Sequence, residues 1–343
     1  MKKLKKILVP LVPAILSALL VKNSAAQDPS FSQFFSSPLN INPALTANIN
    51  ADWRAIANFR DQWIGPASPY VTGTLSYDRK FQKKIPNMEF DGNSFGAGTM
   101  MMYDRAMGGV VKSTYMSLNI SYRVKLTDGK YKHRLGAGFG TIYGHRRIDF
   151  TGIDFEEQFT GYGFNTNLPT GETSLSSMKP YFSVSTGLLY SITSENSNFD
   201  LGVSAFHVNK PKQTFLKDEN QYLPVRKVVH SNFETFLSES LVLNLNAVYQ
   251  SQSTAEYYSF GGALGYYLPY YNDLMLNAGI WYWSKNAVIP YVGLAYKDYQ
   301  FGLSYDVTVS KLRQANDKPN TYELSLIVRG RNKPSFVIPC PWK

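Results

Sequence analysis

The sequence predicts an all-β protein: a closed antiparallel transmembrane β-barrel of about 14 strands. Three observations lead to this fold class. The chain starts with an export signal, it has no later apolar run long enough for a membrane helix, and apolar and polar residues alternate with a period of two along most of its length. The composition agrees, because aromatic residues make up 15% of the 343 residues and include 24 tyrosines. Barrels of this kind span the bacterial outer membrane, with lipid against their outer face.

The first 26 residues have the pattern of a signal peptide. Four lysines among the first six residues precede an apolar run at 7–21, and small residues occupy positions 24–26, as a signal peptidase requires. Pro10 and Pro13 interrupt the run. A membrane anchor is the weaker interpretation, since a spanning helix needs about 20 apolar residues. We therefore expect residues 1–26 to be removed on export.

Charge and cysteine content exclude two classes of protein. The formal net charge of +10 falls to +5 without the five lysines of the signal peptide, so we expect no nucleic-acid partner. The single cysteine, Cys340, cannot form a disulfide within the chain. This is therefore not a disulfide-stabilised secreted domain.

Residues 27–51 form a leader ahead of the first predicted strand. Its aromatic side chains make it apolar, and its prolines remove backbone donors and hold the preceding residues extended. We expect an extended, non-helical segment that docks in the lumen or under it, on the periplasmic side. The residues expected to plug the lumen are Phe31, Phe34, Phe35, Pro38 and Pro43.

Strands are predicted by a strict alternation of side-chain types. Over 116–125, apolar side chains occupy every even position and hydroxyl, amide or charged side chains every odd one. The same period recurs at 199–205, 301–307 and 322–329. Successive side chains of a strand point to opposite faces, so these segments have one apolar and one polar face.

Fourteen such segments are bounded by turn residues, and an even number is what a closed bacterial barrel requires. We predict strands at 52–61, 70–80, 94–103, 113–126, 133–146, 180–192, 199–207, 225–236, 241–250, 257–268, 273–283, 287–297, 300–308 and 320–329. If the first strand leaves the periplasm, the long connections 147–179, 208–224 and 309–319 face the cell surface, which is the usual asymmetry. The barrel domain then covers 52–329, and a C-terminal tail covers 330–343.

A soluble β-sandwich has the same period and is the structural alternative. Two observations favour the barrel. The polar face stays polar throughout, as a hydrated lumen requires, and tyrosine and tryptophan recur near predicted strand ends, as in the aromatic girdles of membrane proteins. The expected girdle residues are Trp53, Trp63, Tyr77, Tyr103, Tyr181, Tyr190, Tyr266, Tyr267, Trp281 and Trp283.

No pattern in the sequence predicts an enzyme, a metal site or a cofactor. The four histidines are widely spaced from one another and from Cys340. A hydrolase that used His145 or His230 would lack any nucleophile motif. The glycine-rich run 136–140 lies inside a predicted strand with no helix after it. We interpret it as a strip of the inner wall against which something packs, and not as a phosphate loop.

Several short blocks carry a resemblance to a known family. They are QDPSFSQFFSSPLNINPALTA at 27–47, RDQW at 60–63, SPY at 68–70, FHVNKP at 206–211, SYDVTVSKL at 304–312, YELSL at 322–326 and IPCPWK at 338–343. In this order they resemble the PorP/SprF family, outer-membrane proteins of the type IX secretion system of Bacteroidetes. The ending departs from the usual Arg-Phe of the family, because Trp342 and Lys343 stand there.

The resemblance implies a non-enzymatic function. Family members support the secretion of type IX substrates, such as gliding adhesins, or hold them at the cell surface, and they associate with periplasmic ring and motor components. The implied partner is therefore a secreted surface protein, bound by its C-terminal domain. The family has no established cofactor and no established catalytic residues that could be assigned to positions of this sequence.

The connection at 149–178 is the candidate partner-binding surface. It is rich in Phe, Tyr and Gly, and aromatic anchors beside flexible residues suit protein recognition. A lid folded into the barrel mouth is an equal alternative. The candidate residues are Asp154, Phe155, Glu156, Glu157, Phe159, Tyr162 and Phe164.

The alternative function is a pore or hydrophobic-ligand transporter, resembling fatty-acid transporters of similar strand number. In that case the leader would be a gate. The residues by themselves favour the pore, and the family resemblance favours binding of a secreted protein.

Overall fold

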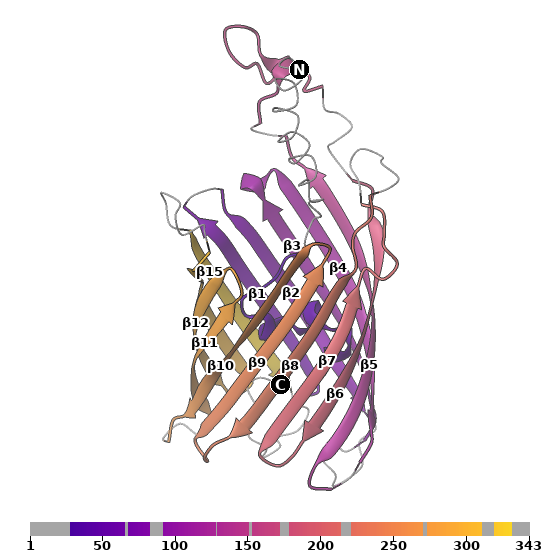
Figure 1. Cartoon of the computed structure of the whole chain (residues 1–343), viewed down its shortest axis with the longest axis vertical. Helices are drawn as coiled ribbons and strands as arrows, with labels where there is room; N and C mark the ends of the chain where they lie inside the picture. Colours follow the sequence, from indigo (N-terminus) through magenta and orange to yellow (C-terminus); the bar gives the residue numbers. More distant parts are fainter. Residues whose placement is uncertain are drawn as a thin grey trace, which may run out of the picture.

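The computed structural model shows a single barrel whose strands run along the length of the molecule (Figure 1). It describes residues 28–65, 68–82, 92–127, 129–150, 153–171, 178–213, 221–269, 273–310 and 319–330. The predicted signal peptide, and the C-terminal tail apart from Gly330, lie outside the described residues. Within the described part, no helix is long and apolar enough to cross a membrane.

The described residues contain fifteen β-strands, of which β13 and β14 are two parts of one barrel strand interrupted at Asp306. The bounds of β1 to β8 are Trp53–Ile64, Tyr70–Gln82, Ser94–Ala106, Val111–Lys125, Lys132–Ile148, Tyr181–Thr193, Ser197–Phe206 and Arg226–Phe236. Those of β9 to β15 are Leu241–Gln252, Ala255–Tyr267, Leu274–Trp283, Ala287–Tyr296, Tyr299–Tyr305, Val307–Thr308 and Asn320–Gly330. All fourteen predicted strands are confirmed, with ends that shift by at most three residues.

The sheet closes on itself. Neighbouring strands pair antiparallel all the way round, including β1 with β15 and β11 with β12. Closure gives each strand a hydrogen-bonding partner on both sides, which is necessary because lipid offers none. The protein is therefore the closed fourteen-stranded antiparallel barrel that the sequence predicted.

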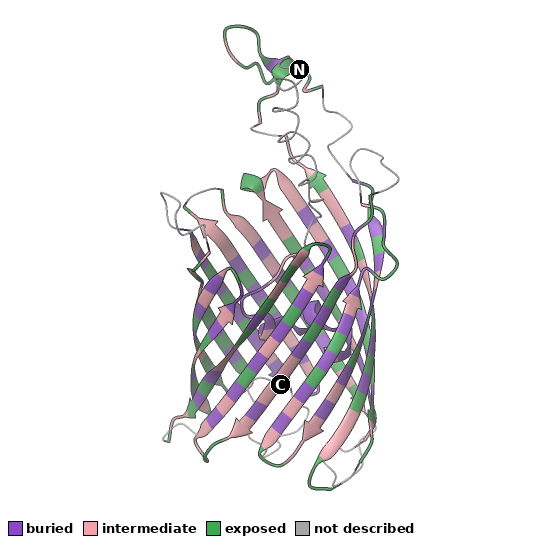
Figure 2. Cartoon of the chain, viewed as in Figure 1, coloured by how far each residue is buried: buried purple, intermediate pink, exposed green. Residues whose placement is uncertain are grey.

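Side chains alternate between the outer wall and the lumen. In β4, Met116, Leu118 and Ile120 are exposed outside, whereas Ser117 and Asn119 are buried inside. Figure 2 shows the exposed and buried bands that result along the strands. An apolar outside around a polar interior is the reverse of a soluble sandwich, whose apolar faces form its core. The soluble alternative is therefore wrong.

Part of the expected aromatic girdle faces the lumen instead of the membrane interface. Tyr77 and Tyr103 are exposed on the outer wall, as predicted, but Tyr181, Trp281 and Trp283 are buried inside the barrel. The prediction used nearness to a strand end, whereas the two-residue alternation decides which wall a side chain joins. These inward rings belong to the surface on which the leader packs.

The leader is not the extended, non-helical segment that its prolines predicted. It forms a 3-10 helix, η1 (Phe34–Ser36), a one-turn α-helix, α2 (Pro38–Ile41), and a second 3-10 helix, η2 (Pro43–Leu45). Pro38 and Pro43 stand in the first turn of a helix, where the N–H that proline lacks would have no partner anyway. Figure 1 shows this segment inside the barrel, so it docks in the lumen and not under it.

The connections distinguish the two ends of the barrel. We call the end that carries 149–180 and 207–225 the long-loop end, and the end that carries 194–196 and 237–240 the short-loop end. The long connections 149–180, 207–225 and 309–319 thus share one end, as predicted, although the connection 83–93 is longer than the others at the short-loop end. That the long-loop end faces the cell surface stays a prediction. Two further 3-10 helices lie at the long-loop end, η3 (Met107–Gly109) and η4 (Glu156–Gln158).

Candidate functional site: the leader in the lumen

The leader crosses the lumen from the long-loop end to the short-loop end. Its first described residue, Asp28, contacts His207 and Gln252, which lie where β7 and β9 end. At the other extreme, Ala47 contacts Asp78 near the short-loop end of β2. Three polar clusters and a group of inner-wall glycines hold the segment between these points.

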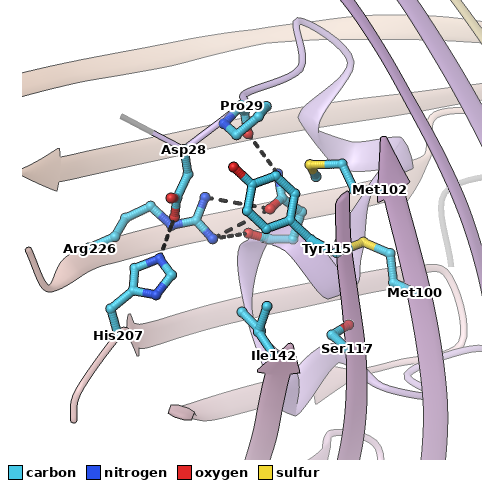
Figure 3. Close-up of a pocket in the computed structure, with 10 residues that line it drawn as sticks. Asp28, Pro29, Met100, Met102, Tyr115, Ser117, Ile142, His207 and Arg226 are labelled. Carbon is cyan, nitrogen blue, oxygen red and sulfur yellow. Dashed lines mark hydrogen bonds and ion pairs between the residues drawn. The ribbon is translucent and has the colours of Figure 1, made fainter. Parts of the chain in front are cut away.

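The outer anchor is an ion-pair cluster around Asp28 (Figure 3). Asp28 Oδ2 lies 2.7 Å from His207 Nε2 and 3.2 Å from Arg226 Nε, and the Asp28 backbone N–H donates to Gln252 Oε1 at 3.0 Å. Burial by itself raises the pKa of the Asp28 carboxyl, but Arg226 and His207 outweigh it and hold that pKa well below its usual range. Arg226 Nη2 also donates to the Asn40 carbonyl at 3.0 Å, so one guanidinium binds the leader at two points.

Ser183 extends the outer anchor into a Ser-His-Asp arrangement. Ser183 Oγ lies 2.7 Å from His207 Nδ1, while Asp28 is bound by Nε2 of the same ring. A serine hydrolase has the reverse arrangement, with the nucleophile at Nε2 and within reach of substrate. Ser183 is fully buried, and its contact orients the His207 ring toward Asp28.

The central anchor joins Arg60 to two carboxylates. Arg60 Nη2 lies 2.8 Å from Asp306 Oδ2, and Nη1 lies 3.2 Å from Glu323 Oε2. The backbone N–H groups of Ser32 and Gln33 donate to the two Glu323 oxygens at 2.8 Å each. Arg60 and Glu323 are buried, and buried ions cost several kcal/mol each unless they are paired and hydrogen-bonded. The leader supplies donors that complete this network.

The side chain of Gln33 is hydrogen-bonded through both its nitrogen and its oxygen. Nε2 donates to Ser304 Oγ at 3.0 Å and to the Glu323 carbonyl at 2.9 Å, and Oε1 accepts from Ser325 Oγ at 2.7 Å. A buried polar group without partners would cost about 1–3 kcal/mol. The inner wall is therefore complementary to an amide at this position of the leader.

Glycines of the inner wall make room for η2. A Cβ added at Gly138 of β5 would overlap the backbone of Ala44, and one added at Gly187 of β6 would overlap the side chain of Asn42. Close approach of another segment is a common reason for glycine within a strand. The prediction that 136–140 is a strip against which something packs is confirmed, and η2 is the segment that packs there.

Asn42 ties this turn to the wall. Its Nδ2 donates to the Leu188 carbonyl at 3.0 Å and lies 3.0 Å from His230 Nε2, and its Oδ1 accepts from the Ala44 N–H at 2.8 Å. The last bond caps η2, since the side chain accepts from an N–H of the first turn. One residue thus defines both the turn and its position on the barrel.

The inner anchor lies at the short-loop end. Arg123 Nη2 donates to the Thr46 carbonyl at 3.0 Å. The Ala47 N–H donates to Asp78 Oδ2 at 2.7 Å, and the same carboxylate pairs with Arg54 at 2.6 Å. The leader therefore joins a buried ion pair between β1 and β2 just before the chain enters β1.

Between the anchors, aromatic side chains of the leader pack on the inner wall. The rings of Phe35 and Trp281 have centroids 4.7 Å apart, and Phe34 belongs to the same buried cluster. Phe31 packs in a second cluster with Met100. Two cavities between leader and wall measure about 30 and 60 Å³, which is room for water molecules and far below the size of a ligand pocket.

The five predicted plug residues all lie in the lumen. Phe31, Phe34, Pro38 and Pro43 are buried there, and Phe35 is half-buried. Their role as a plug remains a prediction.

The candidate partner-binding residues lie on the connection between β5 and β6. Figure 1 shows its described part, 153–171, standing beyond the long-loop end of the barrel. Phe159 and Phe164 pair with centroids 5.2 Å apart, both rings are more than half exposed, and Tyr162 is fully exposed. The seven predicted residues, whose role remains a prediction, are Asp154, Phe155, Glu156, Glu157, Phe159, Tyr162 and Phe164.

Sequence reasoning missed the polar residues of the site on both leader and wall. A signal for the wall was present, because the blocks that resemble the PorP/SprF family contain residues that bind the leader. These residues are Arg60, His207, Ser304, Asp306, Glu323 and Ser325.

The histidines serve separate contacts. His133 Nδ1 lies 2.6 Å from the Tyr190 hydroxyl, while His207 and His230 bind the leader. No cluster of three or more His, Cys, Asp or Glu side chains that could hold a metal ion occurs in the part of the chain that the structure describes.

Comparison with known families identifies the chain. The family model described as type IX secretion system membrane protein PorP/SprF matches residues 23–328 of the sequence. These residues include the leader and nearly all of the barrel. The chain belongs to the PorP/SprF family. The resemblance is thus confirmed, and with it the location in the outer membrane. No curated protein matches the chain.

Solved structures give only distant similarity. The Pseudomonas putida toluene transporter TodX is 12% identical, with a TM-score of 0.44 over 85% of this chain and 93% of that one. A Pseudomonas aeruginosa FadL homologue is 11% identical, with a TM-score of 0.44 over 84% and 92%. The translocator domain of the Neisseria meningitidis autotransporter NalP is 8% identical, with a TM-score of 0.35 over 82% and 90%. These similarities carry no argument about the function of this PorP/SprF-family protein.

Proposed function

We propose that this PorP/SprF-family barrel is a non-enzymatic component of type IX secretion that binds a secreted substrate, such as a gliding adhesin, through its C-terminal domain. Binding would support secretion of the substrate or hold it at the cell surface. The observation that carries the proposal is that the leader occupies the lumen, while exposed aromatic side chains stand beyond the long-loop end. An occupied lumen favours binding at a surface over conduction through the barrel.

The contact surface would be the described stretch 153–171. Phe159, Tyr162 and Phe164 expose large rings there, and exposed aromatic side chains are the usual anchors of protein interfaces. Glu156 and Glu157 stand beside them, so electrostatic complementarity favours a client with a basic patch.

Periplasmic ring and motor components would meet the short-loop end. The leader joins β1 at this end, and Asn50 is exposed there. This junction lies beside the inner anchor, so a partner on the periplasmic side could contact the leader without entering the lumen.

Deleting residues 152–175 tests the binding function. The fourteen strands and the three leader anchors stay intact, so the barrel should still insert, while the client should be released into the medium. Phe159→Ser combined with Phe164→Ser is a milder variant that should act in the same direction. Full retention of the client on cells that carry the deletion would show that this loop is not the binding surface.

A leader-gated pore is the second candidate function. The observation that favours it is that the anchors are ion pairs and hydrogen bonds, which can open and re-form, while the chain continues into β1. Purified protein in planar bilayers separates the two functions. Steady conductance or uptake of a small solute supports the pore, and a sealed barrel that co-purifies with a secreted protein supports binding.

A further inference from the structure

The two ends of the leader lie at opposite ends of the barrel. Asp28 contacts His207, Arg226 and Gln252. His207 directly follows β7, Arg226 is the first residue of β8, and Gln252 is the last residue of β9. All three positions are where strands meet the long-loop end. The amino-terminal end of the described leader is therefore level with that rim.

The later contacts follow the strands toward the other end in chain order. Asn42 binds the Leu188 carbonyl in the middle of β6. Ala47 binds Asp78 near the short-loop end of β2, and Lys80, closer still to that end, donates to the carbonyl of Ile49. The descent is not even, because Asn40 lies beside Pro29 and Arg226 near the long-loop rim, but from Asn42 onward the contacts run to the short-loop end.

We infer that the leader threads the whole height of the barrel with its amino-terminal end toward the cell surface. A protein at the cell surface can then reach that end, whereas a periplasmic partner meets only the junction at 48–52. This differs from the expectation that the whole leader lies on the periplasmic side. The inference rests on the outward orientation of the long loops, which the proposed function shares.

The local contacts make the opposite direction costly. Reversing the chain would remove Asp28 from Arg226 and His207 and would leave these groups buried beside no carboxylate. Removing one partner of a buried ion pair is strongly destabilising, because it leaves an uncompensated charge away from water. The reversed chain would also move Asn42 and Ala44 away from Gly187 and Gly138, whose lack of a side chain makes room for them.

Epitope exposure on intact cells tests the direction in the full-length protein. One variant carries a short epitope with a flexible spacer between Gln27 and Asp28, and a second carries it between Asn50 and Ala51. A third carries it within the outward connection at 161–163 and reports barrel orientation independently of the leader. We expect antibody to bind the first variant as strongly as the third on intact cells, and the second only after permeabilisation.

The outcomes separate the inference from the proposed function. If the loop epitope is detected on intact cells and the amino-terminal epitope is not, the threading direction is wrong. If the loop epitope itself is hidden, the orientation fails, and the inference falls together with the proposed surface binding.

An inserted epitope can itself prevent the leader from passing through the barrel, so a second test uses single cysteine substitutions. In a Cys340→Ala background, Ser30→Cys and Asn50→Cys place single thiols at the two ends of the leader. A membrane-impermeant maleimide should label Ser30→Cys on intact cells and leave Asn50→Cys unlabelled. The reverse pattern would overturn the inference.

Discussion

At the scale of single residues, Arg60 is a buried cation that binds two carboxylates and the leader together. Arg60→Met keeps most of the volume but leaves Asp306 and Glu323 without their counter-charge. Removing one partner of a buried ion pair costs about 3–5 kcal/mol. We expect a loss of that size in the free energy of unfolding, measured by urea titration in detergent, together with a leader that protease can cut.

Two variants control for this effect. Arg79→Met removes a cation from the exposed outer wall and should change stability by less than about 0.5 kcal/mol. Adding Asp306→Asn and Glu323→Gln to Arg60→Met removes all three charges and should recover part of the loss, because no unpaired ion remains buried. Equal stability of Arg60→Met and the unmodified protein would contradict the role of the central anchor.

Asp28 makes the outer anchor depend on pH. Its pKa is lower in the folded protein than in the unfolded chain, where an Asp has a pKa of about 3.9. The stability that its carboxylate contributes is therefore fully present above about pH 4 to 5 and is lost as pH falls toward the folded-state pKa. The stability difference between the unmodified protein and Asp28→Asn should shrink as pH falls below about 4.

Urea titration in detergent at a series of pH values checks this prediction. Asp154→Asn, in the exposed loop, should leave stability unchanged within about 0.5 kcal/mol over the whole range. A difference between Asp28→Asn and the unmodified protein that grows as pH falls below about 4 would have the wrong sign for an ion-paired carboxylate.

At the scale of elements, η2 fits its place on β5 only because Gly138 has no side chain. Gly138→Val would force η2 off the wall, and overpacking of this kind costs about 1–3 kcal/mol. We expect faster proteolysis within 28–50 of the folded protein, followed by mass spectrometry of the fragments. The matched control is Ala137→Val, since Ala137 is exposed on the outer face of the same strand. Equal protection of the leader from protease in both variants would show that η2 can pack on β5 without a glycine at position 138.

At the scale of the whole molecule, the aromatic residues of the leader keep the lumen occupied. Replacing Phe31, Phe34 and Phe35 by Ser removes three rings from the packed clusters. The loss of each of the two buried rings, Phe31 and Phe34, costs about 3–5 kcal/mol. We expect higher conductance in planar bilayers, or loss of the complex with periplasmic machinery, in a barrel that still folds.

The control variant replaces phenylalanine by serine in the outward loop instead of in the leader. Phe159→Ser with Phe164→Ser changes two exposed rings of the outward loop and should leave conductance unchanged. If neither conductance, complex formation nor barrel assembly responded to the leader variant, the leader would have no part in closing or coupling the barrel.

Local sequence patterns alone predict the barrel and which side chains face its outside and its lumen. The outer face of the barrel contacts lipid, and the inner face encloses a polar lumen. Apolar and polar side chains therefore alternate along each strand, and this period of two shows which side chains face outward. That is why 116–125 predicts both a strand and its inner face, and why the strand ends lie within three residues of their predicted positions. The glycines at 136–140 likewise indicated a packed inner wall before the packing segment was known.

The way the leader is held, and the direction in which it runs, depend on contacts between residues far apart in the sequence. Arg60 and Asp306 are 246 residues apart in sequence and Asp28 and His207 are 179 apart, so no local pattern could pair them. The prolines of the leader permit either an extended chain or the first turn of a helix, and the shape of the surrounding wall selects between them. The direction of the leader follows from the same long-range contacts, because its two ends bind opposite ends of the barrel.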